Sequence, residues 1–294
     1  MRVALLGLGL IGGSIARALR RDRAAAWSIV AWTPSGRGPA AALQAGVIDE
    51  AATSPSDALR SADIVVLAAP VPACLELLDR IAGEWAEALA PDAVITDVAS
   101  TKREIVERAG SLRLRFIGGH PMAGREADGF AAATPDLFDG RPWVTVSVPA
   151  GVADATDLDR VEAMAIACGA RPVRLGATEH DDAVAGISHL PLVVAAALVE
   201  TVAGGDGVPR PDWPLASRLA ASGWRDTTRL ARGDAAMGSG ILTTNAAAVS
   251  GRIHDLIAVL EEWAAELERS GGPDGAAVAE RLRSARERLS ASDP

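Results

Sequence analysis

A glycine pattern near the start of the chain constrains its fold more than any other feature. Gly-x-Gly-x-x-Gly follows a short apolar run, 2–6, and opens a stretch with helical spacing, 11–20. The first glycine permits a tight turn, and the second lets backbone N–H groups approach a pyrophosphate at the helix N-terminus. This placement predicts dinucleotide binding, against the alternative of a glycine-rich turn without a ligand. The residues assigned to the loop are Gly7, Gly9, Leu10, Ile11 and Gly12.

Apolar runs alternate with helical patterns as far as Gly176, which is typical of a parallel α/β sheet. After Gly176 only helical patterns continue, the longest over 178–202, where Pro191 should introduce a kink. We therefore expect a dinucleotide-binding domain over 1–176 and an all-helical domain over 177–294. The predicted strands are 2–6, 28–32, 63–68, 93–96 and 114–118, with 143–148 and 171–174 at an edge.

Charge and cysteine content exclude some classes of protein. The formal net charge of -9 argues against a general nucleic-acid-binding protein, which needs a basic face. Cys74 and Cys168, the only cysteines, stand in apolar stretches, which indicates buried thiols in a reducing, cytoplasmic setting without disulfide or metal-site spacing. The glycines within the apolar start, 3–16, favour a phosphate loop over a signal peptide, and we expect no other run to span a membrane.

The end of the second strand bears on the choice of cofactor. An acid there normally binds the adenosine ribose hydroxyls and would repel a 2′-phosphate, but the segment 32–37 has none. The hydroxyls of Thr33 and Ser35, with Arg37, suit a 2′-phosphate, so the segment favours NADP over NAD; the alternative is a solvated Arg37. Ala69 and Pro70 follow another strand and are assigned to the same cofactor site.

Two polar segments after later strands should reach the edge of the sheet where ligands bind. His120, in the glycine-flanked loop 118–124, is the best acid/base candidate because histidine titrates near neutrality; the alternative is a structural histidine. Ser100 could bond substrate or His120, or belong to a capping box that Thr101 and Glu104 predict. Lys102 could add positive charge for a substrate, although its position alone favours a solvated side chain.

The helical half offers further polar candidates. His180 and His189 stand nine residues apart, on roughly opposite faces, and could not share one small site without the kink. Asp181 is expected to cap the long helix together with Thr178. Arg225 could clamp a carboxylate with two parallel hydrogen bonds; the alternative is a surface pair with Asp226.

Six motifs in the same order resemble those of the prephenate/arogenate dehydrogenases over nearly the whole chain. They are GLGLIGGS (7–14), TDVASTK (96–102), FIGGHPMAG (116–124), EHD (179–181), SHLP (188–191) and SGWRDTTR (222–229). HPMAG together with DVAS-x-K is specific to that family. The resemblance implies a Rossmann-type sheet domain, an all-helical dimerisation domain, a homodimer, and NAD(P)-dependent oxidative decarboxylation of prephenate or arogenate in tyrosine biosynthesis.

The same resemblance implies roles for individual residues. His120 would be the catalytic histidine, Ser100 would support it, and Arg225 would bind the side-chain carboxylate of the substrate. His180 would lie near the nicotinamide and substrate, where Lys102 is also assigned. Many prephenate-using members carry a second histidine twelve residues after that of EHD, where this chain has Leu192. With the acid-free second strand, this looks more like the NADP-linked arogenate members and leaves the substrate open.

Other readings make different demands on the sequence. A β-hydroxyacid dehydrogenase relies on a lysine at the domain junction, and Lys102 is the only lysine; a short-chain dehydrogenase needs a tyrosine, and there is none. An imine reductase of similar architecture stays open. A non-catalytic NADPH-binding sensor would keep the glycine loop without needing His120 or Arg225. No metal is expected, and neither a fused mutase domain nor an appended ACT-type domain is expected.

Overall fold

The computed structural model describes residues 1–294 except 23–26, 126, 149–151, 206 and 293–294. The chain forms two compact units, Met1–Ala246 and Ala247–Pro294. The first holds every strand in the described residues together with the helices up to α11 (Ala235–Thr244).

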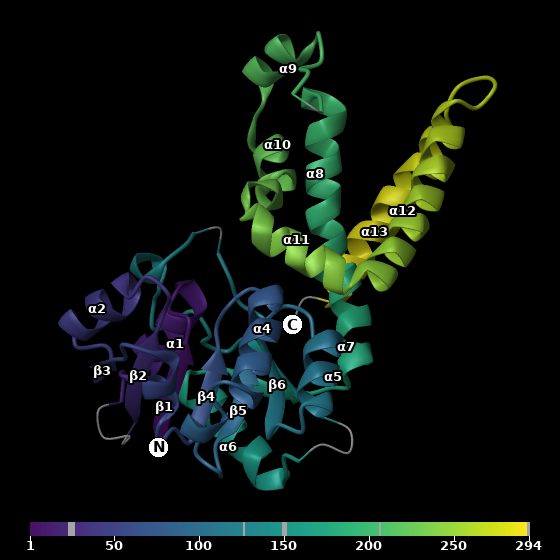
Figure 1. Cartoon of the computed structure of the whole chain (residues 1–294). Coiled ribbons are helices and arrows are strands. Elements are labelled where there is room, and N and C mark those ends of the chain that lie inside the picture. Colours follow the sequence, from purple (N-terminus) through teal and green to yellow (C-terminus); the bar gives the residue numbers. More distant parts are fainter. Residues whose placement is uncertain (23–26, 126, 149–151, 206, 293–294) are drawn as a thin grey trace. The chain divides into compact units, whose positions relative to one another are not determined.

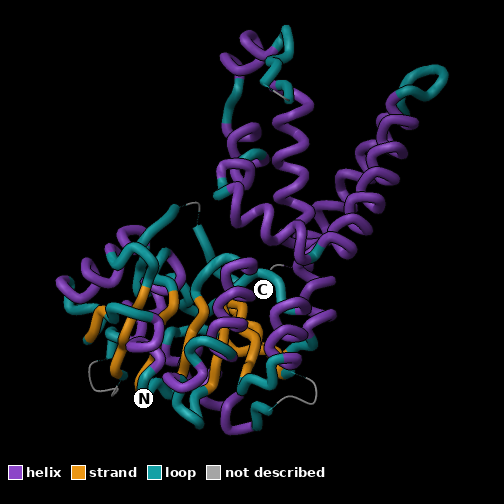
Figure 2. Tube along the Cα trace, viewed as in Figure 1, coloured by secondary structure: helices purple, strands orange, loops and turns teal. Residues whose placement is uncertain are grey.

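An eight-stranded sheet is the centre of the first unit (Figures 1 and 2). Its order is β3-β2-β1-β4-β5-β6-β7-β8. The first six strands are parallel, β7 runs antiparallel to β6, and β8 is parallel to β7. The predicted mostly parallel sheet is confirmed, while the short β3 was not predicted. The strands are β1 (Arg2–Leu6), β2 (Ser28–Trp32), β3 (Glu50–Ala51), β4 (Ile64–Leu67), β5 (Val94–Asp97), β6 (Phe116–Pro121), β7 (Pro142–Ser147) and β8 (Arg171–Arg174).

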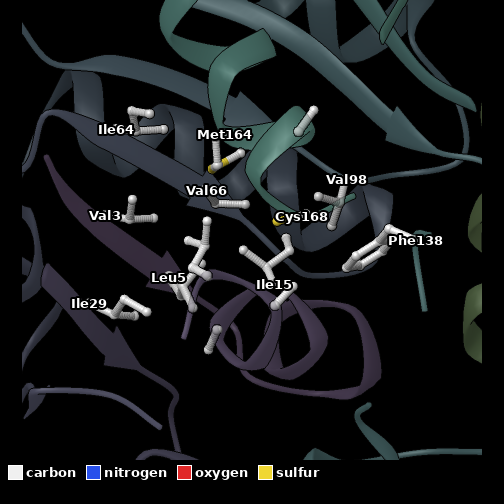
Figure 3. Close-up of a cluster of buried hydrophobic side chains, with 14 of the residues drawn as sticks. Val3, Leu5, Ile15, Ile29, Ile64, Val66, Val98, Phe138, Met164 and Cys168 are labelled. Carbon is white, nitrogen blue, oxygen red and sulfur yellow. The ribbon is translucent and has the colours of Figure 1, made fainter. Parts of the chain in front are cut away.

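Helices cover both faces of this sheet, which is why its central strands are apolar throughout. Alternate residues of β1 enter opposite cores: Val3 and Leu5 pack in one cluster, Ala4 and Leu6 in the other. The first cluster includes residues of α1 and α6 and is drawn in Figure 3; the second includes residues of α3, α4 and α5. Both cysteines are free and buried in these cores, as predicted. The helices are α1 (Leu10–Leu19), α2 (Arg37–Gln44), α3 (Pro55–Leu59), α4 (Val71–Ala82), α5 (Arg103–Ser111) and α6 (Ala155–Ala167).

The parallel strands bring the candidate site residues to one edge. β1 leads into the glycine loop, β5 ends at Asp97, and β6 ends just after His120. The prediction that His120 lies in a loop is wrong, because the antiparallel partner β7 extends β6 to Pro121 and pairs His120 with Val144. The histidine is therefore held by a sheet ladder rather than by a turn.

A continuous helical run follows the sheet: α7 (Ala177–Val184), a π-helical turn (Ala185–His189) and α8 (Leu190–Ala203). The irregularity in this run is the π-helical turn directly before α8; Pro191 lies in the first turn of α8, and the kink expected there stays a prediction. The predicted Thr178–Asp181 cap is wrong, because Glu179 accepts the Gly176 N–H instead. By length and composition alone this run could cross a membrane, contrary to expectation. Its first half, however, carries the buried side chains of His180, Asp181 and His189.

Further helices complete both units. In the first unit these are α9 (Trp213–Leu219), α10 (Ser222–Thr227) and α11. The second unit is a pair of helices, α12 (Ala246–Leu267) and α13 (Gly275–Ser292). An ion pair between Arg281 and Glu262 joins them, and the Arg281 guanidinium lies 4.4 Å from the centre of the Trp263 ring.

The close approach of β6 to β5 depends on Gly119. A Cβ there would lie 2.4 Å from the Asp97 carbonyl oxygen, a backbone atom that cannot move aside cheaply. We predict that Gly119→Ala lowers the free energy of unfolding by about 1–3 kcal/mol through overpacking. Gly124→Ala is the matched control, since a Cβ at Gly124 meets nothing within 4 Å. Denaturant unfolding of both variants checks this, and equal stability would contradict it.

Candidate active site

The glycine loop is built to leave the N-terminus of α1 open. Gly7 has a φ of 114°, and a Cβ there would lie 2.1 Å from the Ala68 carbonyl oxygen. A Cβ at Gly12 would lie 2.4 Å from the Gly7 carbonyl oxygen, whereas one at Gly9 would meet nothing. Gly9 is the N-cap of α1, and no side chain caps the first turn, which includes Leu10 and Ile11. Its N–H groups are free to bind an anion such as a pyrophosphate.

A cavity of about 400 Å³ adjoins this loop. Leu8 and Gly9 line one side of it, and Phe130 lines another. The structure brings together here the three residues predicted to recognise the adenosine end: Thr33, Ser35 and Arg37 all line the cavity. The Thr33 hydroxyl is buried without a hydrogen-bond partner among the described residues, which marks it as available to a ligand. These groups fit a nucleotide, and no acidic residue lines the cavity.

At the other end of the same edge, His120 begins a chain of hydrogen bonds. Its Nδ1 lies 2.8 Å from Nε2 of His180, and the two rings meet edge to face. Nδ1 of His180 lies 2.7 Å from Oδ1 of Asp181. His180 and Asp181 are buried, while His120 is 9% exposed and its Nε2 bonds no described residue. Among the ring nitrogens and carboxylate oxygens of this hydrogen-bond chain, Nε2 of His120 is the atom that a substrate can reach.

The Asp181 carboxylate fixes the direction of these bonds. Burial alone would raise its pKa, but hydrogen bonds from His180 and from the N–H groups of Arg103 and Lys102 hold the pKa below its usual value. Because an ionised carboxylate only accepts, Nδ1 of His180 must be the donor. If the His180 ring holds its one hydrogen on Nδ1, its Nε2 accepts, so His120 donates from Nδ1 and keeps a lone pair on Nε2.

His120 is neutral at physiological pH for electrostatic reasons. Burial is the largest cause of a pKa held well below the usual value for histidine. His180, the Lys102 ammonium and His189 lower the pKa of His120 further. A neutral imidazole with a free Nε2 lone pair is a competent general base.

Asp181 also caps a neighbouring helix. Its Oδ1 accepts the Lys102 N–H at 2.8 Å, and its Oδ2 accepts the Arg103 N–H at 2.9 Å. The predicted capping box is therefore wrong: no side chain within α5 or just before it caps the helix, and the Thr101 hydroxyl instead bonds that of Thr244. The cap comes from a residue far along the chain, which a local pattern cannot reveal.

The Lys102 side chain is not solvated, although its position in the sequence favoured a solvated side chain. Its side chain is fully buried and its ammonium is paired with Oδ2 of Asp97. The same carboxylate accepts the Ala99 N–H at 2.9 Å through Oδ2 and the Gly119 N–H at 2.9 Å through Oδ1. In this geometry the ammonium holds Asp97, and Asp97 holds the strand that carries His120. The assignment of Lys102 to substrate binding stays a prediction.

Ser100 and Arg225 are not joined to the histidine chain. Ser100 is half-buried beyond the end of β5, and its hydroxyl bonds neither His120 nor another described residue. Arg225, on α10, is exposed and forms no ion pair with Asp226 or with any other part of the described chain. Both side chains are consequently available to a ligand, and their predicted roles are untested by the geometry.

Sequence reasoning missed three residues of this site. Asp97 and Asp181 both stood within quoted motifs, and Asp97 directly ends a strand, which is a usable signal. Nothing in the sequence around Asn245 signals a role in the site. Its side-chain N–H₂ donates to the Asp181 carbonyl oxygen at 2.8 Å and lies 3.2 Å from Nδ1 of His189. His189 is also buried, and burial lowers its pKa to about 4. His180 precedes the π-turn and His189 ends it, and both side chains are buried.

Comparison with known proteins agrees with this geometry. A family model described as "Prephenate dehydrogenase, nucleotide-binding domain" matches residues 15–174, and one described as "Prephenate dehydrogenase, dimerization domain" matches residues 176–281. Prephenate dehydrogenase of Bacillus subtilis is 34% identical over 270 residues, which cover 91% of this chain and 68% of that protein.

Solved structures of similar proteins superpose over nearly the full length. Arogenate dehydrogenase of Synechocystis is 32% identical with a TM-score of 0.78, covering 98% of this chain and 100% of that one. Prephenate dehydrogenase of A. aeolicus, in complex with hydroxyphenyl propionate and NAD+, is 27% identical with a TM-score of 0.87, covering 100% and 98%. Both halves of this chain, sheet domain and helical region, therefore belong to the prephenate/arogenate dehydrogenase family.

Proposed function

We propose that this chain is an NAD(P)-dependent dehydrogenase that oxidatively decarboxylates prephenate or arogenate in tyrosine biosynthesis. The observation that carries the proposal is the free Nε2 of neutral His120, held at the same sheet edge as an open dinucleotide loop in a chain of this family. With strands about 4.8 Å apart, β6 lies about 14 Å along the sheet from β1. The glycine loop and His120 thus follow or end strands of the same parallel set, three strand spacings apart.

His120 acts as the base on the ring hydroxyl of the substrate. Its Nε2 takes the hydroxyl proton as hydride leaves the same carbon; a nicotinamide, when bound, would supply the acceptor for that hydride. The resulting ketone is conjugated to the carbon that bears the ring carboxylate. Carbon dioxide then leaves with its bonding electrons going into the ring, and the product is aromatic.

Other residues bind and orient the substrate. The exposed Arg225 guanidinium, free of any ion pair with the described residues, clamps the side-chain carboxylate that prephenate and arogenate share. The Ser100 hydroxyl, which bonds no described residue and lies beyond the end of β5, supports His120. Leu192 stands where many prephenate-using members have a histidine, and this absence of a polar group leaves both substrates as candidates.

NADP is the cofactor that the cavity favours. Its lining offers two hydroxyls and the Arg37 guanidinium but no carboxylate that would repel a 2′-phosphate. Ala69 and Pro70, between β4 and α4, lie beside the glycine loop at the same edge. NAD is the alternative, and it is the cofactor bound in the A. aeolicus relative.

The chain acts as a cytoplasmic homodimer. The dimerisation-domain match covers α8, whose apolar side chains are mostly half-buried, and α9, whose two leucines are exposed. Leu215 is 64% and Leu219 is 75% exposed, as expected of a surface that another protein covers. If a second copy of the chain covers these helices, the long apolar run 177–203 needs no membrane to cover it.

Reduced-nicotinamide formation tests the reaction directly. We expect initial rates above background with prephenate or arogenate, paired with NADP or NAD, and a loss of about 10²- to 10⁴-fold in kcat for His120→Asn with cofactor affinity retained. The variant removes the base while leaving the glycine loop intact. Silence of the wild type in all four pairings would reject the reaction, and full activity of His120→Asn would reject the mechanism.

Arg37→Ala tests the choice of cofactor. Loss of a charge-assisted contact to a 2′-phosphate costs about 1.5–3 kcal/mol, so the Kd for NADP should rise roughly 10- to 150-fold. The Kd for NAD should stay unchanged. Arg60→Ala, an arginine beyond the end of α3 and outside the cavity, is the control. Equal weakening of both cofactors would show that Arg37 does not recognise the 2′ position.

A further inference from the structure

We infer that Asp181 is a positioning residue for catalysis: acting through His180, it keeps the proton of His120 on Nδ1 and so keeps Nε2 free for the substrate. The inference rests on the proposed function, which makes His120 the base. It adds a role for a buried aspartate that touches neither substrate nor cofactor.

The first step of the argument is that this carboxylate has no freedom to turn. Oδ1 accepts from both the Lys102 N–H and Nδ1 of His180, and Oδ2 accepts from the Arg103 N–H. The side chain is fully buried, and Asn245 holds its own carbonyl oxygen. Three fixed donors from two elements therefore define one position for the charge.

The second step is that the fixed charge selects one tautomer at each ring. With Asp181 ionised, His180 donates from Nδ1; if that ring carries a single hydrogen it accepts at Nε2, so His120 donates from Nδ1 over 2.8 Å. If the chain of bonds ran the other way, Nε2 of neutral His120 would carry the hydrogen and could not accept a proton. Asp181 thus decides whether His120 is a base or a donor toward the substrate.

The third step is electrostatic. When His120 takes the substrate proton, positive charge arises beside the buried Lys102 ammonium and close to His180 and His189. The Asp97 carboxylate is already paired with the Lys102 ammonium and accepts the N–H groups of Ala99 and Gly119. Asp181 is the anion that the His180 ring connects to the new charge, and it favours the protonated state of the pair.

Asp181→Asn separates this role from simple capping. The carboxamide matches the carboxylate in shape, but one of its terminal atoms is a donor, so it cannot accept from all three groups. Asp182→Asn is the matched control, because Asp182 is exposed and lies 3.8 Å from the Arg103 guanidinium. Folding is compared by thermal unfolding, and cofactor Kd by titration.

We expect Asp181→Asn to lower kcat by about 10²- to 10⁴-fold relative to Asp182→Asn, with KM and cofactor Kd within a few fold. The acidic limb of the kcat/KM profile should move to lower pH, because loss of the anion makes the histidine pair harder to protonate. A purely structural role would lower stability without moving that limb. Turnover within about threefold of the control, or an unmoved limb, overturns the inference.

Nitrogen-15 NMR of the wild-type histidines gives a readout without substrate. The chain has four histidines, so His120→Asn and His180→Asn suffice to assign the two rings of interest. We expect hydrogen on Nδ1 and a bare Nε2 in both. Hydrogen on Nε2 of His120 overturns the inference even if the enzyme turns over. Absence of turnover with the expected tautomers would instead reject the proposed function alone.

Discussion

The buried ion pair between Asp97 and Lys102 is the interaction on which the rest of the site depends. Both side chains are fully buried, and the carboxylate also accepts the N–H groups of Ala99 and Gly119. It therefore fixes the turn after β5 and ties β5 to β6 beyond their last ladder pair, Thr96 with Ile117. Removing one partner of such a pair typically costs about 3–5 kcal/mol, because the other charge is left buried alone. His120 follows Gly119 directly and takes its position from this contact.

Asp181 is a second buried carboxylate that fixes both the backbone and a side chain of the site. A carboxylate from α7 satisfies the open N–H groups of α5 and orients the ring that orients His120. The Asp181 carboxylate thus serves both to cap α5 and to place the hydrogens on the two histidine rings. A mutation meant to probe catalysis here also perturbs folding, which is why tautomer and pH readouts are more informative than activity alone.

The sequence predicted what depends on local pattern. The strand–glycine–helix start, the alternating strands, the switch to helices after Gly176 and the motifs of the family all follow from residue type and spacing. Thr33, Ser35 and Arg37 line one cavity because they directly follow β2, which pairs with β1 next to the glycine loop, and their role in cofactor binding stays a prediction. Lys102 was misread as solvated because its partner, although only five residues away, is buried by residues from elsewhere in the chain.

What the sequence left open depends on contacts between distant segments. The α5 cap spans 79 residues from Lys102 to Asp181, and the link from Asp181 to Asn245 spans 64. Helical spacing placed His180 and His189 on opposite faces, yet a π-turn, which adds a residue to one helical turn, brings both side chains into the interior. The irregular turn lies where regular geometry would have separated the polar groups of the site. The π-turn therefore accounts both for the irregular helix and for the burial of the two histidines.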